Sequence, residues 1–194
     1  WWPPTFNESK NFILGMQEVV EDVYMILYNP PHAKVLLSLE EISLLKKSVP
    51  NLVGIKCVGG DEQWYSKRRE LLDDFSVFVP GHTVVYGKPL GANGSYSNVA
   101  CLSPNGAVKI WDLIEKDYEK AKALEAKVLN FMKQYILPFA SKLSNTGLDK
   151  LLASVGGWGP VSEKVLWPYD GATAEDVKKI KIQANNELEE ILNV

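Results

Sequence analysis

The chain has 194 residues, which suits one domain or one domain with an appendage and is enough to bury a hydrophobic core. Its 46% hydrophobic and 23% charged residues are ordinary for a soluble globular protein, and its net charge is −3. This balance, without a basic run, indicates neither nucleic-acid binding nor attraction to an anionic membrane surface. No apolar stretch approaches the roughly 20 residues that span a bilayer.

The first residues and the cysteines indicate the kind of chain and its compartment. Trp1-Trp2-Pro3-Pro4 would make an unusual exposed terminus, so we expect a chain cut from a longer one. Cys57 and Cys101 lie beside strand-like apolar residues, and we expect free thiols in a reducing, cytoplasmic compartment rather than a disulfide. The histidines and cysteines lack zinc-ligand spacing, so we expect no structural metal site, and nothing indicates a cofactor.

The first half of the chain alternates helical patterns with short apolar runs. Phe12, Met16 and Val19 share one helical face, Ser38 to Glu41 reads as a capping box, and residues 61–73 have helical spacing. Strands are predicted near residues 23–29, 52–59, 76–81 and 94–99. The first three runs lack polar alternation, which is typical of strands covered on both faces. Strands alternating with helices predict right-handed βαβ units and a parallel sheet.

After the fourth run the pattern becomes helical. Ser103-Pro104 begins a helix, and long amphipathic stretches cover residues 107–140 and 145–155. After a glycine-rich break, Thr173 caps a final helix that runs toward Leu192. Residues 1–106 are therefore expected to form four βα units, and residues 107–194 a final barrel helix with a C-terminal helical domain.

Four parallel strands make either a small doubly wound sheet or half of an eight-stranded barrel. A doubly wound sheet normally has a glycine-rich phosphate loop after its first strand. Asn29-Pro30-Pro31-His32 is not such a loop and fits the βα turn of a barrel better. The expected fold class is α/β, a (β/α)8 barrel of which this chain holds the last four βα units plus a C-terminal helical segment.

In such a barrel the catalytic groups lie at the C-terminal ends of the strands. Lys56 ends an apolar strand, where an ammonium group taken out of water loses its proton more readily and becomes a nucleophilic amine. The alternative is a lysine that snorkels or pairs with a carboxylate. Tyr28 ends the first strand and could move protons, or it could be a core tyrosine. His32, Lys34 and His82 follow strand ends and could meet an anionic substrate, although solvated loop residues are the commoner case.

These residues resemble a known family. The motifs are Ile26-Leu27-Tyr28-Asn29-Pro30-Pro31, Leu52-Val53-Gly54-Ile55-Lys56, Gly59-Gly60-Asp61 and Gly91-Ala92-Asn93-Gly94-Ser95. Together with the tyrosine-to-lysine spacing of 28 and the lysine-to-Gly81 spacing of 25, they resemble the dihydrodipicolinate synthase and N-acetylneuraminate lyase family over essentially the whole chain.

The resemblance implies a Schiff-base lyase or aldolase that acts on pyruvate or a related 2-oxo acid and assembles as a homo-oligomer. It makes Lys56 the residue that forms the imine and Tyr28 the proton relay. It also implies that the backbone at Gly81 and the region of Tyr96 line the acceptor side of the pocket.

Three departures from the family pattern narrow this prediction. The early strands and their carboxylate-binding loop are missing from the chain. The synthases place an arginine five positions after the tyrosine, where this chain has Ala33, and the tyrosine that they lend across a subunit contact falls at Trp2. Strict dihydrodipicolinate synthesis is therefore not expected, and a lyase, aldolase or dehydratase is easier to accommodate.

Two other readings remain open. The chain could be a non-catalytic, truncated half-barrel that associates through its open strand edges. It could also be a binding module that uses the scaffold without chemistry, in which case Lys56 would trap no keto acid.

Overall fold

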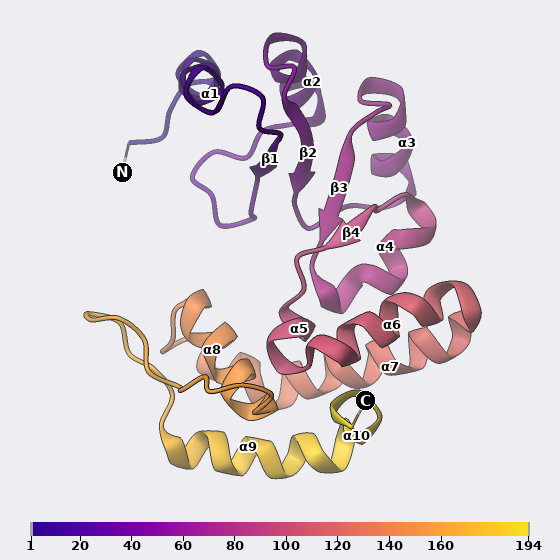
Figure 1. Ribbon diagram of the computed structural model, residues 1–194, viewed down its shortest axis with the longest axis vertical. Helices are drawn as coiled ribbons and strands as arrows, with labels where there is room; N and C mark the ends of the chain where they lie inside the picture. The colour runs from indigo at the N-terminus through magenta and orange to yellow at the C-terminus, as the bar shows by residue number, and fades with distance from the viewer. Residues whose placement is uncertain (1, 194) are drawn as a thin grey trace. The chain divides into compact units, whose positions relative to one another are not determined.

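The computed structural model describes residues 2–193, which divide into two compact units (Figure 1). The sheet unit comprises the residues up to Val79 together with Gly87–Tyr96. The helical unit comprises Pro80–Tyr86 together with the residues from Ser97 onward.

The sheet unit contains the four strands that the sequence predicts. They are β1 (Met25–Tyr28), β2 (Leu52–Lys56), β3 (Ser76–Val79) and β4 (Gly94–Ser95). All neighbours are parallel, and the strand order follows the chain order. The predicted α/β class with a parallel sheet is confirmed.

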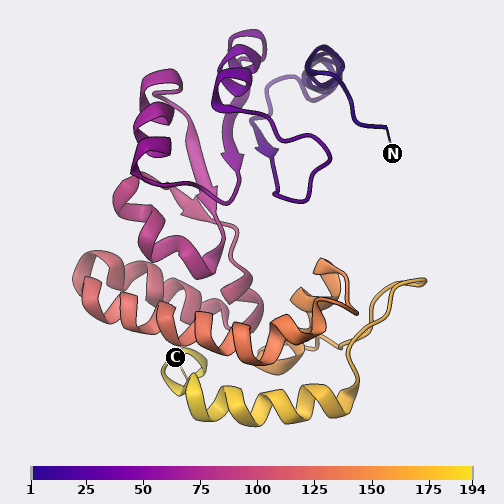
Figure 2. The same cartoon turned by 180° about the vertical axis from the view of Figure 1, so that it is seen from behind.

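The two faces of this sheet are covered differently. Ile55 and Val77 are neighbours in the register of β2 and β3, and both are at most 1% exposed. They share a core with Ile42 and Leu45 of α2 (Leu39–Ser48) and Tyr65 of α3 (Glu62–Leu71). Figures 1 and 2 show both helices on the same side of the strands. Side chains on successive residues of a strand point to opposite faces of the sheet. The residues next to Ile55 in β2 and next to Val77 in β3 therefore point away from α2 and α3.

Local capping explains where the helices of the sheet unit begin. Thr5 and Glu8 form a capping box at α1 (Phe6–Val20), and Ser38 and Glu41 form the predicted one at α2. At α3 the Asp61 side chain accepts a hydrogen bond of 2.9 Å from the backbone N–H of Trp64. Each cap satisfies a backbone donor that the first helical turn leaves without a partner.

The helical unit continues the chain after the sheet. After a 3₁₀ turn at Gly81–Thr83, α4 (Val84–Leu90) crosses the boundary between the units. The remaining helices are α5 (Asn98–Leu102), α6 (Pro104–Lys116), α7 (Tyr118–Phe131), α8 (Asn145–Gly156), α9 (Ala174–Glu187) and α10 (Glu189–Leu192). Met132–Ile136 forms a π-helical turn and Leu137–Phe139 a 3₁₀ turn.

The C-terminal helices close the core of the helical unit. Figures 1 and 2 show α6 and α7 side by side. The buried Ser103 hydroxyl donates to the Ile191 carbonyl at 2.8 Å and accepts from the Gly106 N–H at 3.0 Å. A Cβ at Gly106 would lie 2.4 Å from the Ile191 carbonyl oxygen, so glycine permits this close approach. Ser103 therefore joins the start of α6 to the end of the chain.

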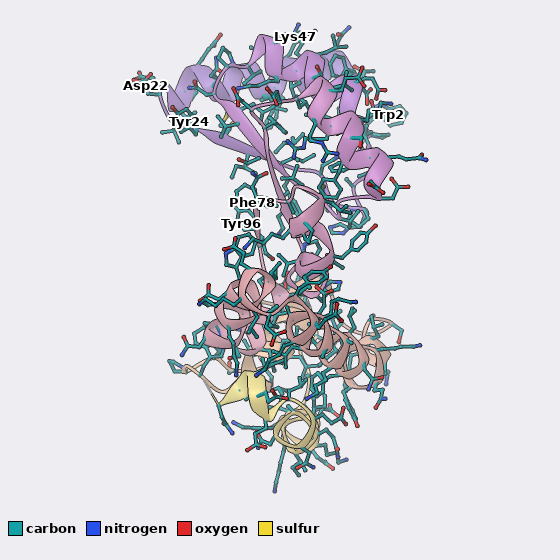
Figure 3. All side chains as sticks on the ribbon, turned by 90° about the vertical axis from the view of Figure 1, so that its right-hand side faces the viewer. Trp2, Asp22, Tyr24, Lys47, Phe78 and Tyr96 are labelled. Atoms are coloured by element: carbon teal, nitrogen blue, oxygen red, sulfur yellow. The ribbon has the colours of Figure 1, made fainter. Side chains whose placement is uncertain are left out.

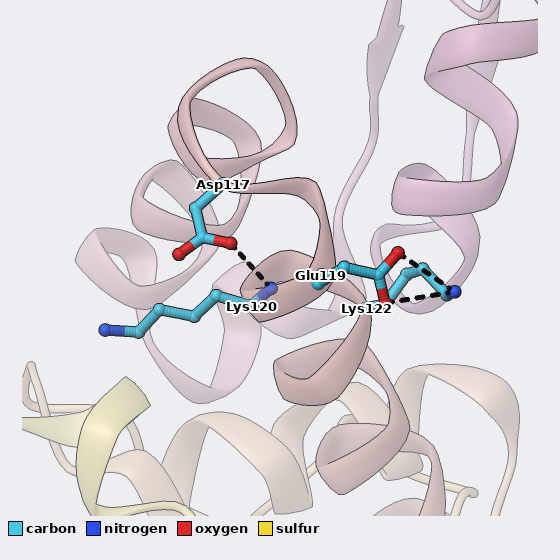
Figure 4. A network of polar contacts seen from close by, with 4 residues as sticks. All are labelled: Asp117, Glu119, Lys120 and Lys122. Carbon is cyan, nitrogen blue, oxygen red and sulfur yellow. Dashed lines mark hydrogen bonds and ion pairs between the residues drawn. The ribbon is translucent and has the colours of Figure 1, made fainter.

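Two predicted elements differ from the structure. The predicted strand at residues 94–99 covers only Gly94–Ser95, because the Ser97 side chain caps α5 and the chain turns helical at Asn98. The predicted helix at 107–140 is interrupted at Asp117. This carboxylate accepts a hydrogen bond from the Lys120 N–H at 3.1 Å and begins a new helix, α7 (Figure 4).

Two general properties hold for the residues that the structure describes. None of their helices combines the length and apolar character needed to cross a membrane. They also include no cluster of three or more histidine, cysteine or acidic side chains arranged to hold a metal ion. Both cysteines are free, Cys57 buried and Cys101 part-buried.

Candidate active site

Tyr28, Lys56 and Phe78 are consecutive neighbours across the carboxyl ends of three strands. The register pairs Tyr28 with Lys56 and Lys56 with Phe78, so all three side chains share one face of the sheet. The Lys56 Nζ lies 4.3 Å from the centroid of the Tyr28 ring. The structure therefore brings together the two residues for which the sequence predicts catalytic roles.

This face is the one that α2 and α3 leave uncovered. The apolar run predicts a desolvated Lys56, and Lys56 is part-buried among the residues that the structure describes. Tyr28 is 52% exposed in this chain. Within this chain the site is an open surface rather than an enclosed pocket.

Tyr96 joins the same group from the segment that follows β4. Its ring centroid lies 5.3 Å from the Lys56 Nζ and also 5.3 Å from the Phe78 ring, with 65° between the two ring planes. Figure 3 shows Phe78 and Tyr96 next to each other. A Cβ at Gly94, which neighbours Phe78 in the register, would lie 2.9 Å from the Phe78 ring. The missing side chain at Gly94 therefore leaves the space that Phe78 occupies.

Asparagine side chains hold the two segments that carry Tyr28 and Tyr96. The Asn29 amide donates to the Leu37 carbonyl at 3.0 Å and accepts from the Leu37 N–H at 3.2 Å, which closes the loop after β1. Asn93 accepts from the Val77 N–H at 2.9 Å through its side chain and donates to the Val77 carbonyl through its backbone. These bonds fix the chain on either side of the site.

His32 and Lys34 lie in the loop that Asn29 closes, and both are exposed. The His32 ring meets the Tyr28 ring edge-on at a centroid distance of 6.4 Å. Lys34 and Ala33 line a cavity of about 530 Å³ together with Tyr28 and residues of α1. Trp2 also lines this cavity, so two positions that depart from the family pattern, Trp2 and Ala33, share one surface with Tyr28.

Gly81 and His82 belong to the helical unit. Gly81 is buried against Ser97, whose Oγ would lie 1.9 Å from a Cβ at that position. His82 is part-buried, and its Nδ1 lies 3.0 Å from the Asn98 Oδ1. The structure thus fixes the conformation of the turn after β3 through the first residues of α5.

The residue after Lys56 is a weak nucleophile. Burial raises the pKa of the Cys57 thiol, opposed in part by a hydrogen bond from the Gly59 N–H. A thiol that stays protonated near neutral pH reacts slowly. Cys57 is therefore not assigned a catalytic role.

Phe78 lies outside the quoted sequence motifs, and Gly94 lies within the glycine-rich motif but has no role assigned to it by the sequence analysis. Both lie in predicted strands, yet their role depends on being opposite Lys56 and Phe78 in the sheet register. Residues at the ends of adjacent parallel strands are neighbours, so an explicit register for β2, β3 and β4 is the signal that would have found them.

A sequence model of the dihydrodipicolinate synthetase family matches residues 1–182. No curated protein matches the chain by sequence. Among solved structures, the N-acetylneuraminate lyase of Fusobacterium nucleatum is similar at 17% identity and a TM-score of 0.75, over 96% of this chain and 62% of that one. The dihydrodipicolinate synthase of Bacteroides thetaiotaomicron is similar at 19% identity and a TM-score of 0.72, over 96% of this chain and 63% of that one.

A prophage protein of the dihydrodipicolinic acid synthase family from E. coli K12, solved in complex with pyruvate, is also similar. It has 20% identity and a TM-score of 0.73, over 97% of this chain and 63% of that one. At these identities the likeness establishes the fold. The chain spans a little over three fifths of the length of each of these neighbours.

Proposed function

Because the chain belongs to the dihydrodipicolinate synthetase family, we propose that it is part of a lyase whose Lys56 forms a Schiff base with pyruvate or a related 2-oxo acid. The observation that carries the proposal is the position of Lys56 at the carboxyl end of β2, with its Nζ over the Tyr28 ring. The pyruvate complex of the prophage neighbour from E. coli K12 supports the substrate class.

In this proposal residues 1–106 supply the last four βα units of an eight-stranded barrel, and residues 107–194 supply the final barrel helix and a C-terminal helical domain. A parallel sheet with helices on one face and catalytic side chains at its carboxyl ends fits the wall of such a barrel. The opposite face, with Tyr28 and Lys56, would then point into the barrel, where the remaining strands would enclose it.

The chemistry follows from the residues at the strand ends. The Lys56 amine adds to the C2 carbonyl carbon of the 2-oxo acid, and the carbonyl oxygen leaves as water as the carbon–nitrogen double bond forms. The cationic imine withdraws electrons from C3, where a carbon–carbon bond can then break or form. Tyr28 lies beside Lys56 and relays the protons that these steps require.

The acceptor side of the pocket is assigned to Gly81, His82 and Tyr96, with His32 and Lys34 meeting anionic groups of the substrate. Ala33 replaces the arginine that clamps a second carboxylate in the synthases. A lyase, aldolase or dehydratase therefore suits the site better than strict dihydrodipicolinate synthesis. We also propose that the protein lies in the cytoplasm and forms a homo-oligomer.

Borohydride inactivation tests the proposed function. The experiment uses the protein with its preceding barrel strands and compares borohydride alone with borohydride plus each of a panel of 2-oxo acids. We expect irreversible inactivation of the wild type only when a suitable 2-oxo acid is present. A Lys56→Arg variant should have no turnover and should gain no adduct in its intact mass, because an arginine does not form the imine. Turnover or an equal adduct in the variant, or no effect of any 2-oxo acid on the wild type, would contradict the role of Lys56.

A second candidate is a non-catalytic half-barrel that associates with another copy. The favouring observation is α1, in which no residue is buried. Phe12 and Val19 of its apolar face are 70% and 80% exposed. Apolar side chains at helical spacing are normally buried against a partner, so this face favours association. The oligomeric state of the chain alone tests this candidate.

A further inference from the structure

We propose that the Tyr96 ring, which like the Tyr28 ring lies within cation–π distance of the Lys56 nitrogen, stabilises the cationic imine formed there. This inference rests on the proposed function and adds a role for a specific ring in it. Tyr96 is then more than a wall of the acceptor pocket, because its ring contacts the atom that carries the charge.

The Lys56 nitrogen is close to two aromatic rings. The Lys56 Nζ lies 4.3 Å from the Tyr28 centroid and 5.3 Å from the Tyr96 centroid, and both distances are within the roughly 6 Å over which a cation is attracted to a ring face. Within residues 2–193, the interactions of this nitrogen are with these rings and not with a carboxylate.

The Tyr96 ring is held in place by its neighbours. Phe78 packs against it at 5.3 Å, and the missing side chain of Gly94 gives Phe78 its space. The segment itself is fixed to β3, because the Ser95 hydroxyl donates to the Val79 carbonyl at 2.8 Å. A ring that packs against Phe78 on a fixed segment loses less freedom on contact with a cation than a ring on a free segment would.

The neighbouring rings favour the imine over the free ammonium group for a physical reason. A lysine ammonium has three donors and is strongly hydrated, so a neighbouring ring competes with water for it. When the carbon–nitrogen bond forms and water leaves, the nitrogen keeps its positive charge, has one N–H and is less hydrated. Attraction to an aromatic face grows as the cation is desolvated, so the rings stabilise the imine more than the ammonium.

Variants of Tyr96 separate the ring from its hydroxyl. The protein with its preceding barrel strands is equilibrated with subsaturating pyruvate and reduced with borohydride, and the adduct on the Lys56 peptide is quantified against that on the exposed Lys47. We expect Tyr96→Phe to stay within about twofold of the wild type, and Tyr96→Leu to lose about threefold to tenfold of the adduct. Tyr118→Leu, which removes a tyrosine ring from beside Lys122 on α7, is the control and should leave the yield unchanged.

A fluorinated series keeps the test independent of folding. Phenylalanines with increasing fluorination, placed at position 96, keep the ring nearly the same size while weakening the negative charge of its face. The proposal predicts an adduct yield that falls steadily along the series. A yield that is flat along the series, or a loss in Tyr96→Phe as large as in Tyr96→Leu, would overturn the role of the ring. No wild-type adduct at Lys56 would instead overturn the proposed function itself.

Discussion

Glu125 is a buried carboxylate on α7 that accepts a hydrogen bond of 2.9 Å from the Val85 N–H. Burial raises the pKa of Glu125, and the Val85 hydrogen bond opposes the rise in part. The folded state therefore binds this proton more tightly than the unfolded state. The resulting stability is fully present below the unfolded pKa of about 4.5 and is lost as the pH rises through the higher folded value.

Glu125→Gln should remove this pH dependence, because the amide keeps an acceptor oxygen for Val85 without a titrating charge. From about pH 4 to pH 8, the free energy of unfolding of the wild type should fall relative to that of the variant. Urea unfolding across this range measures the difference. Glu119→Gln, on the exposed side of the same helix, is the control and should run parallel to the wild type, whereas parallel curves for Glu125→Gln would contradict the assignment.

A further prediction concerns Ala33 and is tested on the protein with its preceding strands. The wild type should condense pyruvate with aspartate semialdehyde poorly, because it lacks a fork of donors for the second carboxylate. Ala33→Arg should raise this activity about tenfold, and Ala33→Lys, which adds the charge without the fork, should raise it less. A wild-type rate comparable with that of authentic synthases would show that no clamp is needed.

The sequence predicts some site residues better than others. Lys56 and Tyr28 are unusual in their surroundings, since each is a reactive group that ends an apolar strand. Phe78 and Gly94 are ordinary strand residues, and their relation to Lys56 arises only from the register of the assembled sheet. Local composition therefore finds the reactive groups but not the residues that support them.

At the scale of elements, β2 depends on how closely it approaches β3. A Cβ at Gly54 would lie 2.8 Å from the Ser76 carbonyl oxygen and 3.2 Å from its Cβ, so the glycine permits the strands to pair as they do. Gly15, on α1, has nothing within 4 Å of its Cβ position. The same substitution should have opposite effects at these two sites.

Gly54→Ala should lower the free energy of unfolding by about 1–3 kcal/mol, because backbone must move to admit the methyl group. Gly15→Ala should raise it by about 0.5–1 kcal/mol through helix propensity alone. Chemical denaturation of both variants beside the wild type gives the comparison. If Gly54→Ala were neutral, the strands would not be as tightly constrained as the contact distances indicate.

Helix starts were easier to predict than strand and helix ends. The capping box at Ser38 and the serine-proline start at Ser103 are local signals, and α2 and α6 begin there. The sequence pattern predicts neither the break at Asp117 nor the short length of β4, because apolar residues keep recurring across both places. In each case a side-chain cap, at Asp117 or Ser97, begins a new helix.

At the scale of the whole chain, the sheet unit leaves apolar surface uncovered. Phe12 and Val19 of α1, with Tyr24 before β1, are each at least 70% exposed. The exposed edge of β1 adds unpaired backbone groups along the same side, since β1 is the first strand in the order. Such a surface is expected to bind another copy or further strands.

Residues 1–194 expressed alone should therefore associate and show no turnover. A 2-oxo acid at Lys56 would not be held in a reactive position, because the chain alone lacks the rest of the barrel. Light scattering over a concentration series should show dimers or larger species, and a Phe12→Glu, Val19→Glu double variant should shift the equilibrium toward the monomer. Ile182→Glu, at an exposed position on α9, is the matched control and should not. A monomeric, cooperatively folding and active wild-type chain would refute this prediction.

The central claim is that Lys56 is the residue that becomes covalently attached to the 2-oxo acid. Peptide mapping after borohydride reduction in the presence of isotopically labelled pyruvate tests it most directly, on the protein with its preceding barrel strands. We predict that the label is found on the peptide that contains Lys56 and is absent from the Lys56→Arg variant. Label on another lysine, or on no lysine with any 2-oxo acid tried, would contradict the claim.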